Sequence, residues 1–319
     1  MRYISYDDTI ARLSWPDAVE ALRAGHRLPR AQIADMFLGE ATGNLLSRGA
    51  WIEGLGFCVK SVTIFNENPQ HGLPTIQGAM LVFDAVNGAL EAVVDGSLVT
   101  EIKTAADSVL GALCLARPDS RHLLIVGGGP VARSLIKAYP AAFPGLDRIS
   151  LWTRRPEQAQ ALAAEFDGTV EAVTDLRDAA GQADIISTAT LARAPVLHGD
   201  WIKPGTHVDL IGAYTPDMRE ADDTLMARAS VYVDCRETTI GHIGELMIPM
   251  AGGVITEASV LGDLYDLVNG GASARTSPEA ITVFKNGGGA HLDLMIARYI
   301  AAATSQDGDL KGEGQRMTS

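Results

Sequence analysis

Apolar residues in the first third of the chain occur in short runs that are typical of antiparallel strands. A helix is predicted over residues 16–28, where Pro16 suits a first-turn position and apolar residues recur at helical spacing. Asn87-Gly88 is a dipeptide typical of tight hairpins. The predicted strands cover 57–65, 79–84 and 89–94. An antiparallel sheet is therefore expected, followed by a helix over residues 103–116.

From residue 119 the pattern changes to short, fully apolar runs separated by helical segments. The predicted strands are 123–126, 149–152, 170–173, 185–187, 207–211 and 231–233. Strands that alternate with helices indicate a parallel, doubly wound sheet with helices on both faces. The expected fold class is α/β, with a Rossmann doubly wound parallel sheet and an N-terminal α+β domain.

The chain length and the change from one pattern of apolar and polar residues to the other predict two domains. We expect an N-terminal domain over residues 1–118 and a dinucleotide-binding Rossmann domain over 119–288. The helical stretch 289–304 lies beyond the α/β pattern and is expected to return to the first domain. Residues 305–319 are polar, and a disordered tail is predicted there.

Composition excludes several classes of protein. The chain has 319 residues and a net charge of −13, which argues against nucleic acid or an anionic membrane as partner. No window approaches the roughly 18 apolar residues that a membrane-spanning helix needs. Three widely spaced cysteines without a CxxC pair favour core thiols and a cytoplasmic location. No spacing of His, Cys or Asp is typical of a metal site.

A glycine-rich turn follows the first apolar run of the second region and opens a helix. It consists of Gly127, Gly128, Gly129, Pro130, Val131 and Ala132. In the pattern GxGxxA the first glycine forms the turn, the second lets backbone approach a pyrophosphate, and the alanine lets helix and strand pack closely. The helix N-terminus adds free N–H groups. The turn therefore predicts a site for NAD or NADP.

The end of the second strand of this region bears on the choice of cofactor. Thr153, Arg154 and Arg155 stand there, without the acidic residue that holds the ribose 2′-hydroxyl in NAD sites. Charge therefore favours NADP. NAD stays open, because either arginine also suits stacking on adenine or plain solvation. Thr188 and Thr190 follow a later strand and are expected to border the cofactor.

Three cations predict a small anionic substrate in this acidic chain. Lys60 shares a strand face with apolar neighbours, which costs free energy unless an anion meets the ammonium group. Lys103 and Thr104 stand where a helix is expected to begin, a position that attracts anions. Arg48 lies upstream of the lysine strand. Alternatively, Lys60 reaches water from an edge strand and Arg48 forms a surface or interface salt bridge.

An ordered set of motifs runs through nearly the whole chain. The motifs are Val59-Lys60-Ser61-Val62, Gly72-Leu73-Pro74-Thr75-Ile76-Gln77-Gly78, Asp95-Gly96, Lys103-Thr104-Ala105-Ala106, the glycine turn, Gly205-Thr206-His207-Val208, Gly262-Asp263-Leu264 and Ile281-Thr282-Val283-Phe284-Lys285. Taken together, this ordered set resembles the ornithine cyclodeaminase/mu-crystallin family.

The resemblance implies a homodimer in which the N-terminal domain binds substrate and packs against its copy. It implies that Lys60 and Lys103 lie near a substrate carboxylate and that Lys285 lies in a segment near the nicotinamide. The family includes ketimine and Δ1-pyrroline-2-carboxylate reductases, alanine dehydrogenases, iminosuccinate reductases and cyclodeaminases.

Two departures from the family pattern narrow the choice. Tyr214 stands where cyclodeaminases carry an acidic residue, which disfavours ring-closing deamination. Phe37 stands near the position where ketimine reductases of the family place a carboxylate-binding arginine. Arg48 lies eleven positions later and is a candidate to replace it, or to hold a second carboxylate as in iminosuccinate.

We therefore predict an NAD(P)H-dependent reductase that converts a carboxylate-bearing imine to an L-amino acid. Arg48, Lys60, Lys103 and Thr104 would bind the carboxylate. Lys60, partly desolvated, would also be the catalytic proton donor. The alternatives are an ammonia-releasing ornithine cyclodeaminase and a non-catalytic small-ligand binder that keeps the cofactor site.

Overall fold

The computed structural model describes residues 1–40, 42–272 and 275–305. The chain forms two compact units, which are Met1–Lys103 together with the segment from Gly289, and Thr104–Gly288. Substrate binding by the first unit and cofactor binding by the second stay predictions. The tail predicted over residues 305–319 lies almost wholly outside the described residues.

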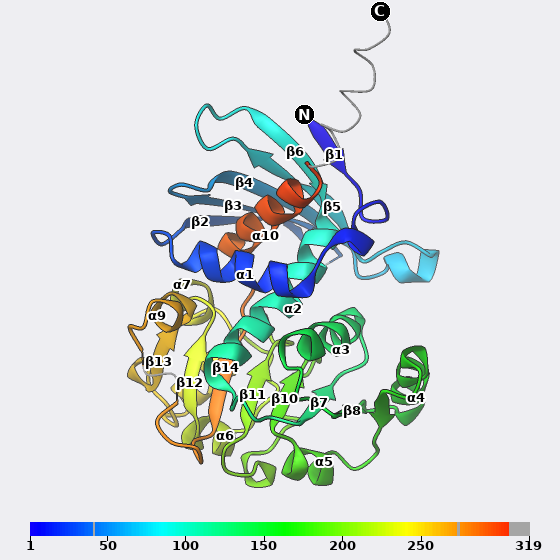
Figure 1. Cartoon of the computed structure of the whole chain (residues 1–319), viewed down its shortest axis with the longest axis vertical. Helices are drawn as coiled ribbons and strands as arrows, with labels where there is room; N and C mark the ends of the chain where they lie inside the picture. Colours follow the sequence, from blue (N-terminus) through cyan, green and yellow to red (C-terminus); the bar gives the residue numbers. More distant parts are fainter. Residues whose placement is uncertain (41, 273–274, 306–319) are drawn as a thin grey trace, which may run out of the picture. The chain divides into compact units, whose positions relative to one another are not determined.

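The first unit is built on a six-stranded sheet (Figure 1). Its strands are β1 (Arg2–Ile4), β2 (Gln32–Glu40), β3 (Gly43–Ile52), β4 (Gly56–Ile64), β5 (Ile76–Phe83) and β6 (Leu90–Asp95). They lie in the order β1-β6-β5-β4-β3-β2, and all neighbours are antiparallel except β1 and β6. Since residues of a strand alternate between faces, each strand presents one set of side chains to each side.

Helix α10 (Ala290–Ala303) packs against one face of this sheet, with helix α1 (Trp15–His26) beside it. The close approach of the two helices depends on Gly25. A Cβ at that position would lie 2.4 Å from the Met295 sulfur. Residues that face α10 are buried, among them Cys58, Lys60 and Val62 of β4. The core of the unit therefore lies between the sheet and α10.

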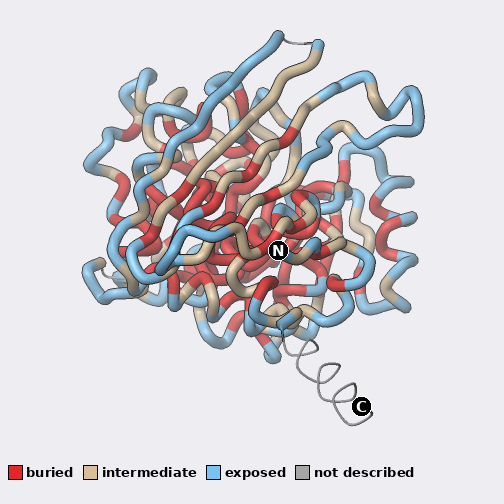
Figure 2. Tube along the Cα trace, turned by 90° about the horizontal axis from the view of Figure 1, so that it is seen from above, coloured by how far each residue is buried: buried red, intermediate tan, exposed pale blue. Residues whose placement is uncertain are grey.

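The other face of the sheet is much less covered. Strand β2 is mainly exposed and most of β3 is intermediate, as the pale blue and tan traces in Figure 2 show. Phe57 and Phe65 are both exposed there, as are several residues of β2. This unit therefore carries one buried face and one open, apolar face.

The second unit contains an eight-stranded, fully parallel sheet in the order β13-β12-β14-β11-β10-β7-β8-β9. The strands are β7 (His122–Val126), β8 (Arg148–Trp152), β9 (Val170–Ala172), β10 (Ile185–Thr188), β11 (His207–Leu210), β12 (Ser230–Val233), β13 (Val260–Asp263) and β14 (Thr282–Lys285). The strand order reverses between β7 and β10, which is where doubly wound sheets bind their ligands.

Short helices cover this sheet (Figure 1). They are α3 (Pro130–Ala142), α4 (Pro156–Ala163), α5 (Leu176–Gln182), α6 (Asp223–Arg228), α7 (Arg236–Thr239), α8 (Gly244–Ala251) and α9 (Leu264–Val268). The strand residues of β7, β10 and β11 are buried on both faces, which explains their continuous apolar runs. Helix α2 (Gly96–Leu115) contributes residues to both units.

The predicted fold class is confirmed by the parallel sheet and the separate antiparallel one. The hairpin at Asn87-Gly88 is also confirmed, since Gly88 has a φ of 72° and its N–H binds the Asp84 carbonyl. The predicted start of a helix at Lys103 is wrong, because α2 begins at Gly96. Within the described residues, no helix is long and apolar enough to span a membrane.

Candidate active site

Two lysines and one aspartate form a buried ionic cluster in the first unit. The Lys60 ammonium lies 3.0 Å from Asp293 Oδ1, and the Lys103 ammonium lies 3.1 Å from the same oxygen. Lys60 also donates to Thr100 Oγ1 at 2.7 Å. The three charged side chains are all at most 7% exposed. Sequence reasoning expected both lysines here but did not identify Asp293.

The elements of this unit explain how these side chains meet. Lys60 lies on the face of β4 that α10 covers, Lys103 lies on α2, and Asp293 lies in the first turn of α10. Lys60 and Asp293 are 233 positions apart in the chain. The available signal for Asp293 was an acidic residue in a predicted helix that is otherwise almost entirely apolar.

The cluster shifts the protonation of its members. Burial alone would raise the pKa of the Asp293 carboxyl, but the charges of Lys103, Lys60 and Arg48 outweigh burial and lower it to about 2. Burial lowers the pKa of the Lys103 ammonium to about 8, against the attraction of Asp293. Asp293 is therefore an anion at neutral pH, and Lys103 loses its charge as pH rises through about 8.

Arg48 joins this cluster from strand β3 but is already paired. Its Nε donates to Asp35 Oδ1 at 3.2 Å and its Nη2 to Asp35 Oδ2 at 2.5 Å. Arg48 is the cross-strand neighbour of both Asp35 on β2 and Lys60 on β4. The structure thus brings Arg48 next to Lys60 as predicted, together with an acidic partner that sequence reasoning missed.

Thr104 takes a different position from the one expected. Because α2 begins at Gly96, the backbone N–H of Thr104 lies inside the helix and not at its free N-terminus. Its carbonyl accepts a hydrogen bond from Asn286 Nδ2 at 3.0 Å. The expectation of free helix-terminal N–H groups at this residue is therefore wrong, and contact of its side chain with substrate stays a prediction.

The glycine turn lines a cleft of about 410 Å³ in the second unit. Its lining includes Gly127, Gly128, Gly129, Thr153, Arg154, Arg155, Ala189 and Thr190. Gly127 has a φ of 134°, and a Cβ there would lie 2.5 Å from the Ala189 carbonyl oxygen. Only glycine therefore satisfies both the conformation and the space at this position.

The turn leaves room and hydrogen-bond donors for phosphate. Apart from Gly129 and its two chain neighbours, no heavy atom of the described residues lies within 4 Å of the position that a Cβ on Gly129 would take, so backbone is accessible there. Gly129 caps α3 without a side-chain hydrogen bond, while Pro130 and Val131 form the first turn. Ala132 is fully buried where the helix meets the sheet. These features fit the pyrophosphate of a dinucleotide.

The strand tip beside this cleft carries no acid. Thr153 is buried, and its hydroxyl donates to the Arg155 carbonyl at 2.6 Å. Arg154 and Arg155 are exposed and line the cleft. An exposed guanidinium pair in this place suits a negatively charged group on the ribose more than a bare 2′-hydroxyl.

A buried glutamate that sequence reasoning missed holds the Thr190 loop. Glu220 Oε1 accepts from the backbone N and the hydroxyl of Thr190, both at 2.7 Å, and Oε2 accepts from Gly212 N at 2.6 Å. Glu245 in turn accepts from the backbone N of Glu220 at 2.7 Å. The wall of the cleft is therefore tied to a fully buried carboxylate.

Two further predicted cofactor residues lie inside the fold. Thr188 is fully buried in β10. Lys285 is fully buried in β14, and its ammonium donates to the Leu210 carbonyl at 2.8 Å. Burial lowers the pKa of Lys285, against the attraction of Glu245 and Glu220. Direct contact of either residue with a nucleotide stays a prediction.

Two further polar residues, Tyr214 and His242, lie in exposed loops. Tyr214 is 64% exposed in a loop of the second unit. His242 lies in a turn and is exposed. Within the part of the chain that the structure describes, no three His, Cys, Asp or Glu side chains are grouped so as to hold a metal ion.

Comparison with known proteins defines the class to which this fold and these sites correspond. The model of the ornithine cyclodeaminase/mu-crystallin family matches residues 50–308, and the chain belongs to this family. The Δ1-pyrroline-2-carboxylate reductase of Paracoccus denitrificans (strain Pd 1222) is 66% identical over 303 residues, which are 94% of this chain and 96% of that protein. The family assignment made from the motifs is therefore confirmed.

Solved structures agree with this assignment. The Thermococcus litoralis Δ1-pyrroline-2-carboxylate reductase in complex with NADH and L-proline has a TM-score of 0.88 at 27% identity and covers 97% of this chain and 98% of its own. The iminosuccinate reductase of Paracoccus denitrificans in complex with NAD⁺ has a TM-score of 0.87 at 24% identity, with 96% and 97% covered. The second likeness concerns the fold alone.

Proposed function

We propose that this chain reduces a carboxylate-bearing imine to an L-amino acid at the expense of NADH or NADPH, with Δ1-pyrroline-2-carboxylate as the substrate and L-proline as the product. The observation that carries the proposal is the buried cluster of Lys60, Lys103 and Asp293. It has two cations and one anion, and so an excess of positive charge that a substrate carboxylate balances. The relative at 66% identity carries the same activity in its name.

The cluster has hydrogen-bonding capacity for such a substrate. An ammonium group has three N–H donors, and among the described residues Lys60 uses two, toward Thr100 and Asp293. Asp293 Oδ2 is buried and accepts no hydrogen bond from the described residues. The lysines would hold the substrate carboxylate, while Asp293 would accept the N–H of a protonated imine. A protonated imine is the better hydride acceptor, so this charge pattern assists the reaction.

Lys60 is the proposed proton donor, and Lys60, Lys103 and Thr104 are the proposed direct substrate contacts. Arg48, which is paired with Asp35, would act on the substrate through its charge. In the second unit, Gly127 to Ala132 would hold the pyrophosphate. Thr153, Arg154, Arg155 and Thr190 would line the adenosine half and the adjoining loop. When bound, the nicotinamide supplies the hydride that the imine carbon accepts. The two exposed arginines favour NADPH over NADH.

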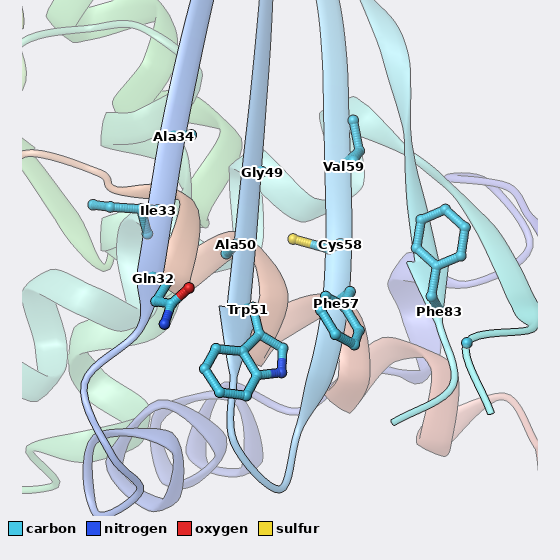
Figure 3. Close-up of a pocket in the computed structure, with 11 residues that line it drawn as sticks. Gln32, Ile33, Ala34, Gly49, Ala50, Trp51, Phe57, Cys58, Val59 and Phe83 are labelled. Carbon is cyan, nitrogen blue, oxygen red and sulfur yellow. The ribbon is translucent and has the colours of Figure 1, made fainter. Parts of the chain in front are cut away.

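The open face of the antiparallel sheet supports a homodimer. The rings of Trp51 and Phe57 stack with centroids 6.1 Å apart, and Phe83 stands opposite Phe57 on the next strand (Figure 3). These rings line a hollow of about 570 Å³ together with Ile33 and Val59. A second copy of the same face would bury this apolar surface.

We also propose a cytoplasmic location, because the three widely spaced cysteines form no CxxC pair and suit a reducing compartment.

A substrate panel tests the proposed function. Oxidation of NADH and of NADPH would be followed with Δ1-pyrroline-2-carboxylate, Δ1-piperideine-2-carboxylate, pyruvate plus ammonia, and oxaloacetate plus ammonia. We expect the highest kcat/KM with Δ1-pyrroline-2-carboxylate. Ammonia release from ornithine without net cofactor oxidation would instead identify a cyclodeaminase. Binding of NADPH without turnover of any imine would identify a non-catalytic binder.

A further inference from the structure

Asp35 and Arg48 form a bidentate salt bridge at the edge of the ionic cluster of Lys60, Lys103 and Asp293. The two side chains meet in the fork geometry that guanidinium groups prefer for carboxylates, with contacts of 3.2 and 2.5 Å. They are cross-strand neighbours on β2 and β3, so the sheet itself fixes their approach. Asp35 therefore occupies the Nε–Nη2 edge of Arg48 and neutralises its charge.

The pair belongs electrostatically to the Lys60 cluster. Arg48 is the cross-strand neighbour of Lys60, and such neighbours have Cβ atoms about 4.5 to 5.5 Å apart. Its charge helps to lower the pKa of both Asp293 and Lys103. Arg48, Lys60 and Asp35 from the sheet thus meet Lys103 of α2 and Asp293 of α10, and these three cations and two carboxylates of the described residues carry one net positive charge.

We propose that Asp35 determines substrate specificity, because it holds Arg48 and thereby restricts the site to imines with one carboxylate. This inference rests on the proposed function. A single carboxylate balances the excess charge, whereas a dicarboxylic imine would bring a second carboxylate to an arginine that is already neutralised. The energetic cost of that second carboxylate is repulsion by Asp35 and the lack of a cationic partner.

Replacing the carboxylate with an amide of the same shape tests the proposal. Asp35→Asn leaves the strand pairing intact and releases the charge of Arg48. The measured quantity is kcat/KM with oxaloacetate plus ammonia, which condense to iminosuccinate, divided by kcat/KM with Δ1-pyrroline-2-carboxylate. We expect the ratio to rise at least tenfold. Asp147→Asn removes an equivalent partner from Arg121, an exposed pair of the second unit, and should leave the ratio unchanged.

A second pair of variants separates specificity from folding. Arg48→Met leaves Asp35 without its cation. Binding of Δ1-pyrroline-2-carboxylate should therefore weaken, with a KM about tenfold higher. The double variant Asp35→Asn with Arg48→Met restores the balance of charge, so its KM should return to within about threefold of the wild type. Its preference for the monocarboxylate should also return.

The outcomes distinguish the two proposals. A wild-type enzyme that reduces no imine contradicts the proposed function. A wild type that reduces Δ1-pyrroline-2-carboxylate, with a selectivity ratio unchanged in folded Asp35→Asn, overturns the role of Asp35 and leaves the function intact. A wild type that already prefers oxaloacetate plus ammonia overturns it equally. If Asp35→Asn fails to fold, an unrestored KM in the double variant overturns the proposal and a restored one supports it.

Discussion

The two candidate sites of this protein are built in opposite ways. The nucleotide cleft of the second unit is lined by a few short segments, such as Gly127 to Gly129, Thr153 with Arg154, and Ala189 with Thr190, and each segment is nearly continuous in sequence. The cation cluster of the first unit consists of side chains that come from β3, β4, α2 and α10. The cleft has its charges at an exposed rim, whereas the cluster holds most of its charges buried.

This difference determines what a substitution does. In the cleft, the shape of a turn carries the function, so changes in backbone freedom matter most. In the cluster, the buried charges stabilise one another, so removing one leaves a buried partner with one counterion fewer. Each of the following variants therefore alters either the nucleotide cleft or the ionic cluster, and the unaltered site serves as the control.

The largest effect is expected for Lys60→Met. It removes the proposed proton donor and leaves the Asp293 carboxylate with one cation fewer, so kcat/KM should fall about a thousandfold. The dissociation constant of NADPH, measured by fluorescence, should change less than threefold, because the cleft is unaltered. Lys137→Met, at an exposed position of α3, is the matched control. Near-normal turnover in folded Lys60→Met would refute the assignment.

Gly127→Ala tests the backbone side of the comparison. The new Cβ would lie 2.5 Å from the Ala189 carbonyl oxygen, at a φ of 134° that other residues avoid. We expect NADPH affinity to fall about a hundredfold, with some loss of stability. Gly241 has a φ of 77°, and in the described part of the chain no heavy atom other than its own and those of its two chain neighbours lies within 4 Å of the added Cβ, so Gly241→Ala controls for strain alone. Equal affinities in the two variants would argue against a nucleotide site at this turn.

Glu220→Gln should give a smaller effect on the same cleft. The two carboxylate oxygens of Glu220 accept from Thr190 N and Gly212 N, one oxygen each. A glutamine has only one acceptor oxygen, so one of these buried N–H groups would lose its partner. The dissociation constant of NADPH should rise about tenfold, while the KM for the imine stays within about twofold. Asp222→Asn is the control, since it also replaces a carboxylate of the second unit but keeps the one oxygen that accepts from Gly199 N and Leu225 N. It should leave nucleotide affinity unchanged.

The smallest effect is a shift in pH dependence caused by Lys103. Because burial lowers its pKa to about 8, the ammonium is charged below that pH and neutral above it. The kcat/KM for the imine should therefore fall as pH rises through about 8. In Lys103→Arg, the fall should move to higher pH, since a guanidinium stays charged. An unchanged profile in this variant would exclude Lys103 as the titrating group.

The same shift affects stability in a defined direction. Between about 8 and the ordinary lysine pKa of 10.5, the unfolded chain binds more protons at this residue than the folded chain does. Lys103 alone therefore makes the free energy of unfolding rise with pH across that window. Thermal melting of wild type and Lys103→Arg across this range measures the contribution.

The sequence predicted the cleft better than the cluster, for the same structural reason. A turn such as Gly127 to Ala132 is contiguous, so its pattern is visible along the chain. Lys60 and Lys103 were also visible as unusual cations, but Asp293 is 233 positions from Lys60, and no local pattern links them. Asp35 was missed because β2, an exposed edge strand, lacks the clear alternation of apolar and polar residues.

Errors in the elements have equally local causes. Strand β6 ends at Asp95 and α2 begins directly at Gly96, where Asp95 Oδ1 accepts from Ser97 N at 2.8 Å and so stabilises the start of the helix. The predicted helix therefore began too late, at Lys103. Strands β13 and β14 were missed because neither is a continuous apolar run, since β13 contains Gly262 and Asp263 and β14 begins at Thr282 and ends at Lys285.

One measurement tests the central claim most directly. The enzyme would be supplied with Δ1-pyrroline-2-carboxylate and NADPH or NADH carrying deuterium at the transferable position of the nicotinamide. The proposed function predicts L-proline with one deuterium on its α-carbon, formed in equal amount to the cofactor oxidised. Proline without deuterium, or cofactor consumption without proline, would contradict the claim that this site reduces the carbon–nitrogen double bond.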